Sequence, residues 1–437
     1  MFALLQIKNE HKIYRRRRKS RLRKTLYSQI ANFRNGDVNR FSSKVIRYLL
    51  KHSSTCNVQK NTIIVPNRLC FKSNFVECVN FLLMVVSTHY HANGNLVLDF
   101  SFCSEVSVSA LVTLKSILEE LEAFSIKVAR SRYNQTPKKI KLVQSKSDKV
   151  NRHLHSLGFA SFNVAKEEQR EYLILGLMRG KSRNFRENRK AVVSKKVAQF
   201  VEDTAERFGV GFDERGQNYI ERMVGEILSN AEDHSLKKSE WFVDGVSYLH
   251  SDKDNEVIEF NLAIINYGDS MYEGFELTKE ENHLIYSKLE NLYLEHQKLF
   301  TKKCSFEREP LFVLYMLNEG ISRIKYLESS RGNGTMNFIK SFIDLGKFSN
   351  NDEVYKPEMN IISGHTVLSC TDEYAPFRKD SHYVLTLNKS QERSDLPDSS
   401  VLKYYNDSLF PGTILDCKIF LNKQYLDKHL SEQNNNG

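Results

Sequence analysis

The spacing of apolar residues in the first third of the chain predicts a compact α/β unit over residues 60–165. Short β-branched or apolar runs are typical of buried strands, whereas apolar residues three and four positions apart are typical of amphipathic helices. The expected strands are Thr62–Val65, Asn95–Phe100 and Ser125–Ala129, and the expected helices are Val76–Val86, Val108–Phe124 and Val150–Leu157. The basic segment 130–149 is expected to be a loop, and Gly158 to end the last helix.

The same two patterns, short apolar runs and apolar residues three and four positions apart, recur over residues 190–421 and predict a second α/β unit. It opens with two expected helices, Lys190–Phe208 and Arg215–His234. The expected strands are Glu240–Leu249, Val257–Tyr267, Ile361–Cys370, His382–Asn388 and Gly412–Leu421. Segment 275–330 interrupts them as an insertion with two expected helices, and Met336–Leu345 predicts a further helix. Residues 1–55 form a basic, helix-prone arm, and 422–437 a frayed tail.

Composition is that of a folded protein of two or three domains, with 437 residues of which 41% are hydrophobic. The net charge is +11, but eight basic residues lie between Arg15 and Lys24, and subtracting them leaves +3. Seven cysteines without a CxxC pair predict a reducing, cytoplasmic environment. The most apolar run, Phe81–Val86, is far shorter than the ~20 residues that cross a bilayer, so we expect no membrane segment.

The expected helix Arg215–His234 carries the most informative polar pattern. Its apolar residues bury one face, and Glu226, Asn230 and His234 follow at successive i+4 positions beside it, with Asp233 next to them. Such a row could hold a hydrated magnesium ion through Asn230, while Glu226 orients a water or hydroxyl for in-line attack. A solvated polar face on a packing helix explains the same pattern, so both interpretations stay open.

Two later segments add groups suited to a nucleotide. The strand Val257–Tyr267 ends in an amide, Asn266, followed by Gly268, where a base edge could be read, although a simple turn has the same pattern. Gly332 and Gly334 precede an apolar helix, and the free N–H groups at such a helix start can cradle phosphates.

Taken in order, these segments resemble the successive motifs of GHKL ATPases. The matching residues are Glu226-x-x-x-Asn230, Asn266-x-Gly268, Gly332-x-Gly334-Thr335 and Gly412-Thr413. The superfamily includes gyrase B subunits, histidine kinases, mismatch-repair ATPases, heat-shock chaperones and anti-sigma-factor serine kinases. The resemblance covers residues 190–421 and implies a Bergerat-type α/β sandwich that binds Mg-ATP between a helix layer and a mixed sheet, with 275–330 as a helical lid insertion.

By this resemblance, Glu226 is the general base, Asn230 the magnesium ligand and Asn266 the adenine reader. The other residues implied to line the nucleotide are Gly268, Gly332, Gly334, Thr335 and Thr413. Arg323, Lys325 and Arg331 lie at the end of the insertion and could touch the γ-phosphate, although each is individually more typical of a solvated surface cation. The family normally has an aspartate where Asn266 stands. An asparagine oxygen can accept the same hydrogen bond from the adenine amino group, but the amide is neutral and can also donate.

Residues 60–165 resemble a STAS domain, the fold of anti-sigma-factor antagonists, through LVLDFSFCSEVSVSALVTL and VNRHLHSLGF. Such antagonists are often phosphorylated on a serine at the start of the helix, where Ser107 and Ser109 lie. The usual Asp-Ser-Ser-Gly is absent, and a serine there also serves as a simple helix cap.

These features predict an ATP-binding regulator that hydrolyses Mg-ATP or transfers a phosphoryl group to a serine of a STAS-type or sigma-factor-like protein partner. GHKL modules often pair, so a homodimer is also possible. One alternative is a non-catalytic nucleotide-sensing scaffold. Another is a nucleic-acid-associated protein that acts through the basic run Tyr14–Lys24, which suits phosphates or an acidic partner equally well.

Overall fold

The structure is a computed structural model, and it describes thirteen segments of the chain. The described residues are 42–53, 61–91, 94–131, 136–159, 172–181, 189–207, 214–233, 240–252, 255–298, 306–318, 334–345, 356–379 and 382–422. The basic run 14–24 and the tail 423–437 therefore lie outside the described residues. None of the described helices is long and apolar enough to cross a membrane.

Residues 42–159, called the N-terminal unit below, contain a three-stranded parallel sheet in the order β1-β3-β5. The strands are β1 (Thr62–Ile64), β3 (Leu96–Asp99) and β5 (Ile140–Val143), and β2 (Arg68–Leu69) and β4 (Glu105–Val106) form a small second pair. The helices are α3 (Lys44–His52), α4 (Phe71–His91), α5 (Val108–Ser131) and α6 (Asp148–Ser156). Gly158, with a φ of +75°, follows α6 at the expected place.

Two expectations for this unit are wrong. Ser125–Ala129 lies in the last part of α5 and is not a strand, because Leu121, Ser125 and Ala129 are buried at successive i+4 positions. The third strand is β5, inside the segment expected to be a loop. Only alternate residues of β5 contact the core, and the segment around this short strand is rich in lysine. The strand signal in the sequence is therefore weak.

The second unit, residues 172–422, contains an eight-stranded sheet in the order β14-β11-β10-β15-β9-β8-β6, with β7 also paired to β8. Its strands are β6 (Tyr172–Ile174), β7 (Met178–Lys181), β8 (Glu240–Asp252), β9 (Asn255–Tyr267), β10 (Glu358–Gly364), β11 (Thr366–Thr371), β14 (Leu402–Tyr404) and β15 (Phe410–Asn422). A separate hairpin joins β12 (Phe377–Lys379) to β13 (His382–Val384), which is shorter than expected.

Every pair of neighbouring strands described in this sheet is antiparallel, so the expectation of a mixed sheet is wrong. The reason is the position of β15. It lies between β9 and β10, antiparallel to both, and so separates two strands that run parallel to each other. The single strand expected at Ile361–Cys370 is also wrong: the chain turns at Gly364, whose φ is +62°, and forms the β10–β11 hairpin.

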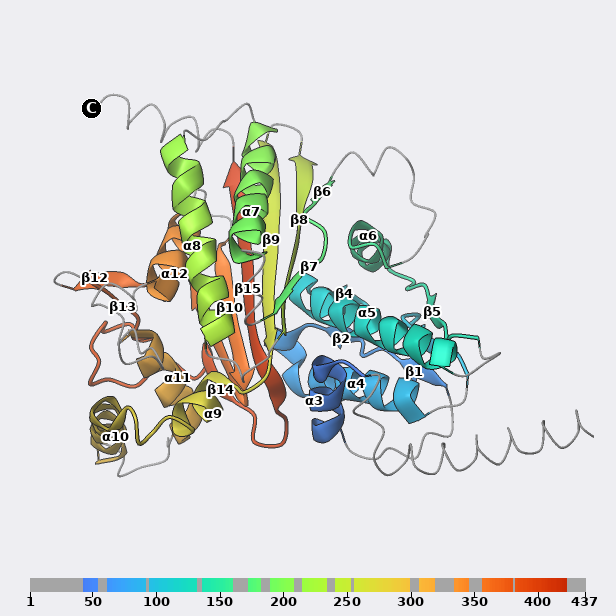
Figure 1. Cartoon of the computed structure of the whole chain (residues 1–437). Coiled ribbons are helices and arrows are strands. Elements are labelled where there is room, and N and C mark those ends of the chain that lie inside the picture. The colour runs from blue at the N-terminus through green and yellow to red at the C-terminus, as the bar shows by residue number, and fades with distance from the viewer. Residues whose placement is uncertain are drawn as a thin grey trace, which may run out of the picture.

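One face of the eight-stranded sheet, called the helix face below, is covered by helices (Figure 1). These are α7 (Arg189–Glu206), α8 (Glu214–Asp233), α11 (Arg308–Asn318) and α12 (Gly334–Leu345), with α9 (Met271–Glu276) and α10 (His283–Lys298) beside them. The two helices expected within 275–330 are therefore present as α10 and α11. Alternate residues of β9, namely Phe260, Leu262 and Ile264, share one hydrophobic core with these helices.

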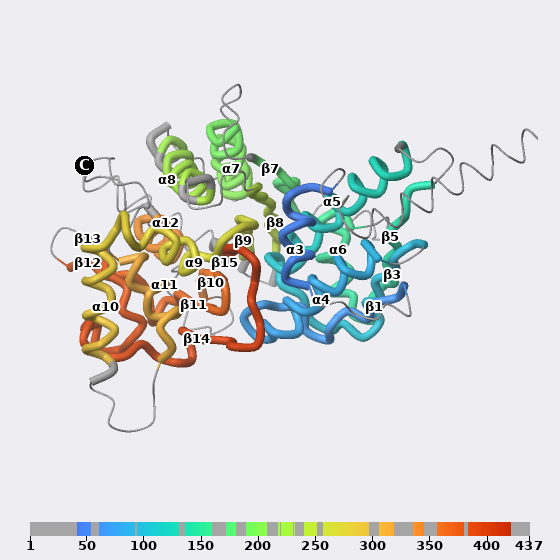
Figure 2. Tube along the Cα trace, turned by 60° about the horizontal axis from the view of Figure 1, so that its bottom comes forward, coloured from blue at the N-terminus to red at the C-terminus, as the bar shows by residue number. Residues whose placement is uncertain are grey.

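The N-terminal unit packs on the opposite face, called the back face below, where α5 contacts β8, β9 and β15. Phe242, Ile265 and Ile414 of the sheet join the core of the N-terminal unit. Figure 2 shows the N-terminal unit and α10 at opposite sides of the molecule. The eight-stranded sheet is therefore the middle layer, with a different neighbour on each face.

Candidate functional site

Asn266 lies at the end of β9 on the helix face of the sheet. Side chains of a strand alternate between faces, and Asn266 follows Ile264 by two residues, so it points to the same side. Its backbone partners are Trp241 on β8 and Thr413 on β15. The side chain is 6% exposed, and its oxygen Oδ1 is buried without a hydrogen-bond partner. A buried, unsatisfied acceptor costs about 1–3 kcal/mol, and such groups often have a functional role.

Thr413, which the resemblance put near the adenine pocket, is the direct neighbour of Asn266 across the β9–β15 pair. Its hydroxyl lies 2.8 Å from the hydroxyl of Ser363, at the end of β10. The Ser363 hydroxyl also accepts a hydrogen bond from the Met271 N–H at 2.8 Å. Ser363 therefore ties three segments together beside Asn266. Sequence reasoning missed it, although the Ser-Gly pair that ends β10 was a turn signal.

The glycine before Thr413 has a steric reason. Gly412 has a φ of +140°, and a Cβ added there would lie 2.0 Å from the carbonyl oxygen of Asn266. Any other residue would therefore push β15 away from the end of β9. The Gly268 N–H donates to the carbonyl oxygen of Pro411 at 3.4 Å, so Gly268 also lies where the two strands meet.

The helix α8 buries the face that its pattern predicts, with Met223, Val224 and Leu228 in the core. Glu226 lies beside that face with a side chain 40% exposed, and its Oε1 lies 3.4 Å from Arg222 Nε on the same helix. Asn230 belongs to α8, one turn further on, but its side chain lies outside the described residues, as does all of His234.

The mid-helix residue Gly225 has α7 as its neighbour. A Cβ added to Gly225 would lie 3.4 Å from the Ser194 hydroxyl, which is ordinary van der Waals contact. A side chain at position 225 would therefore fit, and the contact between α7 and α8 does not require glycine here.

The helix α12 begins at Gly334, the second glycine of the expected phosphate-binding segment. Thr335 is half-buried in its first turn. Met336 and Ile339 share the core with α8, which contacts α12 directly. The remaining expected contacts, Arg331 and Gly332 together with Arg323 and Lys325, lie outside the described residues.

The topology brings these separate segments to one end of the helix face. Glu240, the first residue of β8, pairs with Tyr267, so β8 starts where β9 ends. The helix α8 comes directly before β8 among the described elements and lies over the helix face of the sheet (Figure 1). Ser363, near the end of β10, pairs with Thr413 at the same level. Strands far apart in the chain thus place three polar side chains, Asn266, Thr413 and Ser363, in a row under the helix layer.

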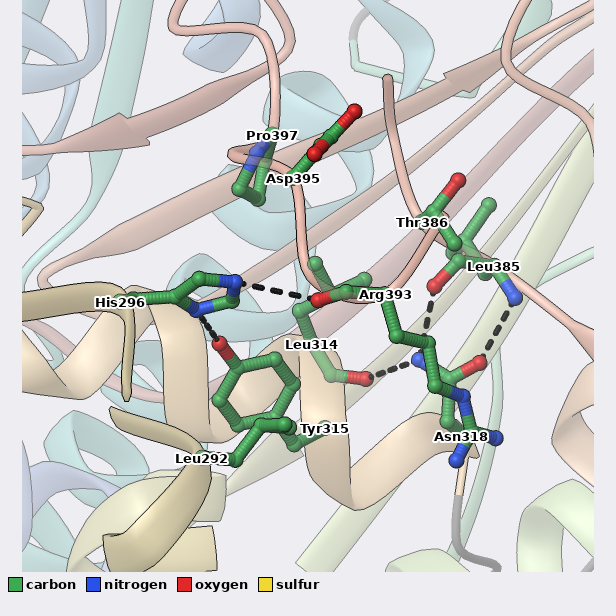
Figure 3. A pocket seen from close by; sticks show the side chains of 10 residues that line it. All are labelled: Leu292, His296, Leu314, Tyr315, Asn318, Leu385, Thr386, Arg393, Asp395 and Pro397. Atoms are coloured by element: carbon green, nitrogen blue, oxygen red, sulfur yellow. Dashed lines mark hydrogen bonds between the residues drawn. The ribbon is translucent and has the colours of Figure 1, made fainter. Parts of the chain in front are cut away.

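A cavity of about 20 Å³ lies elsewhere, between α10, α11 and the segment 385–397 (Figure 3). It has room for about one water molecule. Its polar side chains already bond one another: His296 Nε2 donates to the Arg393 carbonyl oxygen at 3.0 Å, and His296 Nδ1 accepts from the Tyr315 hydroxyl. Asn318 binds both backbone groups of Leu385. The arrangement joins α10 and α11 to the loop and is too small for a nucleotide.

Within the described part of the chain, no group of three or more His, Cys, Asp or Glu side chains is placed to hold a metal ion. Comparison with protein-family models, with curated proteins and with solved structures found no match for this chain.

Proposed function

We propose that this protein binds Mg-ATP on the helix face of the sheet, in the manner of GHKL ATPases. In this proposal the adenine lies against Asn266 and Thr413, and the triphosphate extends toward α8 and the first turn of α12. The bound nucleotide is hydrolysed, or its γ-phosphoryl group is transferred to a serine of a partner protein.

The observation that carries this proposal is the unpaired Oδ1 of Asn266 beside Thr413. An adenine amino group donates a hydrogen bond, which is what this oxygen lacks. The start of α12 is a helix N-terminus, where the helix dipole favours anions such as phosphate groups. Contact between α8 and α12 supports a single site built from both helices.

The chemistry assigned to α8 follows from its side chains. Asn230 would supply an amide oxygen to Mg²⁺, which needs few protein ligands because it keeps several waters, and the ion would neutralise charge on the phosphates. Glu226 takes the proton of the attacking water or serine hydroxyl as its oxygen bonds to the γ-phosphorus. The bond from the γ-phosphorus to the bridging oxygen breaks, and ADP leaves. The half-exposed Glu226 carboxylate is open to such a nucleophile.

The serine acceptor in this proposal belongs to another molecule. Ser109 is fully buried, and the Ser107 hydroxyl accepts a hydrogen bond from the Ala110 N–H at 3.2 Å as a helix cap. Both lie at the start of α5, which packs on the back face, whereas Asn266 faces the other side. The eight-stranded sheet separates them from the proposed nucleotide.

The test is isothermal titration of the full chain with Mg-ATP, followed by measurement of phosphate release. Asn266→Leu should remove detectable binding, and Asn230→Ala should weaken it at least tenfold. Glu226→Gln should retain binding and lose at least 100-fold in turnover, because it removes the general base. Glu221→Gln, on the same helix, is the matched control and should change neither. Unchanged binding in both asparagine variants would contradict the proposed site.

One observation favours a second function, nucleotide sensing without turnover. The Glu226 Oε1 lies 3.4 Å from Arg222 Nε, and this ion pair competes with a nucleophile for the same carboxylate oxygen. Under this alternative ATP binds, but Glu226→Gln leaves the cellular function intact and no phosphate is released. Arg222→Gln separates the two, because freeing Glu226 should raise turnover in an ATPase and have no effect on a sensor.

A further inference from the structure

The amide of Asn266 is the one buried asparagine side chain in the described segments whose orientation no hydrogen bond fixes. The other buried asparagines, Asn261, Asn282, Asn318 and Asn360, all donate to oxygen atoms nearby. In Asn318 and Asn360 both ends of the amide are bound: Asn360 Oδ1, for example, accepts from the Ser369 hydroxyl at 2.6 Å. Asn266 has no such bond, and its Oδ1 is unpaired.

An unfixed amide can turn by 180° and present either an oxygen acceptor or an NH₂ donor at the same point. The group at position 6 of a purine is likewise a donor in some bases and an acceptor in others. Adenine carries an amino group there, which donates, whereas guanine and hypoxanthine carry a keto oxygen, which accepts. A carboxylate at this position would only accept and would repel the keto oxygen of guanine and hypoxanthine. The amide can pair with either class by rotating.

We propose that the site accepts both 6-amino and 6-keto purine nucleoside triphosphates, and that Asn266 is the residue that removes the discrimination between them. This inference rests on the proposed function, because it assumes that the base lies against the end of β9. Thr413 and Ser363 do not restore the discrimination. Hydroxyl groups also donate and accept, and the pair at 2.8 Å can exchange these roles.

The test compares Mg-ATP with Mg-ITP. The purine of ITP has a keto group in place of the amino group at position 6 and therefore also carries a proton on N1. Titration of the full chain should give dissociation constants for the two nucleotides within about tenfold of each other. Asn266→Asp, measured at pH 8.5, should keep ATP and weaken ITP at least 100-fold. Asn261→Asp, on the same strand but facing the back, is the matched control and should leave the ratio unchanged.

The outcomes separate the inference from the proposed function. Binding of ATP with a preference above 100-fold over ITP in the unmodified chain would overturn the inference and leave ATP binding intact. The same preference for ITP would also overturn it. If neither nucleotide binds, the proposed function fails and this inference fails with it. If Asn266→Asp does not fold, the ratio in the unmodified chain decides alone.

Discussion

Two neighbouring residues at the end of β9, one on each face of the eight-stranded sheet, differ in how their polar groups are paired. On the back face, Lys115 Nζ donates to the fully buried Asp244 at 2.7 Å, and the Ser116 and Tyr267 hydroxyls lie 2.7 Å apart. On the helix face, Asn266 lies at the end of the same strand as Tyr267 and has no partner. Of these two neighbours on β9, Tyr267 points to an interface where its hydroxyl is paired, and Asn266 points to a site where its amide oxygen is not.

This difference separates polar groups that stabilise the fold from those available to a ligand. A hydrogen bond or ion pair between buried groups stabilises the fold. Removing one partner leaves the other buried without compensation for its lost hydration, which destabilises the fold. An unpaired buried group lowers stability and persists in natural proteins mainly where function requires it. Substitutions on the back face should therefore cost stability, whereas those on the helix face should cost ligand binding.

The largest effect is expected at the buried ion pair between the two units. Lys115→Met leaves the carboxylate of Asp244 buried without its charged partner, with the Gly245 N–H still donating to it, so the free energy of unfolding should fall by about 3 kcal/mol. Urea denaturation measures it. Lys127→Met, an exposed position on the same helix, should change stability by less than about 0.5 kcal/mol. A loss below about 1 kcal/mol for Lys115→Met would show that the two units are not held by this pair.

A matched pair of substitutions compares the two faces directly. Asn360→Leu on the back face leaves the Ser369 hydroxyl without its acceptor and removes one donor to the Glu358 carboxylate, which keeps Lys72, and should cost about 2 kcal/mol. Asn266→Leu removes an unpaired amide, so stability should stay unchanged or rise by up to about 1 kcal/mol. Thermal unfolding of both variants measures the difference. Equal losses at the two positions would refute the contrast between the faces.

The smallest effect is a pH dependence on the back face. Burial and the charge of Glu358 raise the pKa of Asp416 on β15 from 3.8 to about 6. Between pH 4 and 6 the folded chain therefore holds a proton that the unfolded chain has released, and stability falls as pH rises through this window. With solvent screening of this partly exposed group, we expect a change of about 1–2 kcal/mol.

The informative measurement for Asp416 is the difference between the unmodified chain and Asp416→Asn at each pH. The raw curve also contains opposing groups: burial lowers the pKa of His89 to about 4, so its contribution rises with pH in the same window. The variant should gain stability relative to the unmodified chain from pH 4 to pH 6. A flat difference would mean that Asp416 is already well solvated in the folded protein.

The sequence predicts the strongly periodic elements well, because periodicity reflects burial of one face. The helix α8 and the long strands β8, β9 and β15 lie where their apolar spacing puts them. The prediction failed where the signal was local and weak: β5 is only four residues long and lies in a segment with many lysines, and Gly364 divides what was expected to be one strand. No local pattern reveals that β15 enters between β9 and β10.

The candidate site was predictable in part for the same reason. Asn266 and Thr413 were named from their motifs, and only the register of β9 with β15 shows that they are partners. Ser363 joins them through a strand pairing that sequence spacing does not contain. The sequence cannot show that the Asn266 amide oxygen is unpaired. This depends on the packed structure, in which no neighbouring group donates a hydrogen bond to it.

The central place of β15 has a consequence for how the protein is made. β15 is the last described strand in chain order, yet β9 and β10 both pair with it. During translation, both strands leave the ribosome with their inner edges open until residues 410–422 follow, and open edges invite association between nascent chains. Such long-range pairing is also slow to form. Chaperone protection until residues 410–422 have emerged should therefore raise the yield of folded protein more than it would for a sheet closed early.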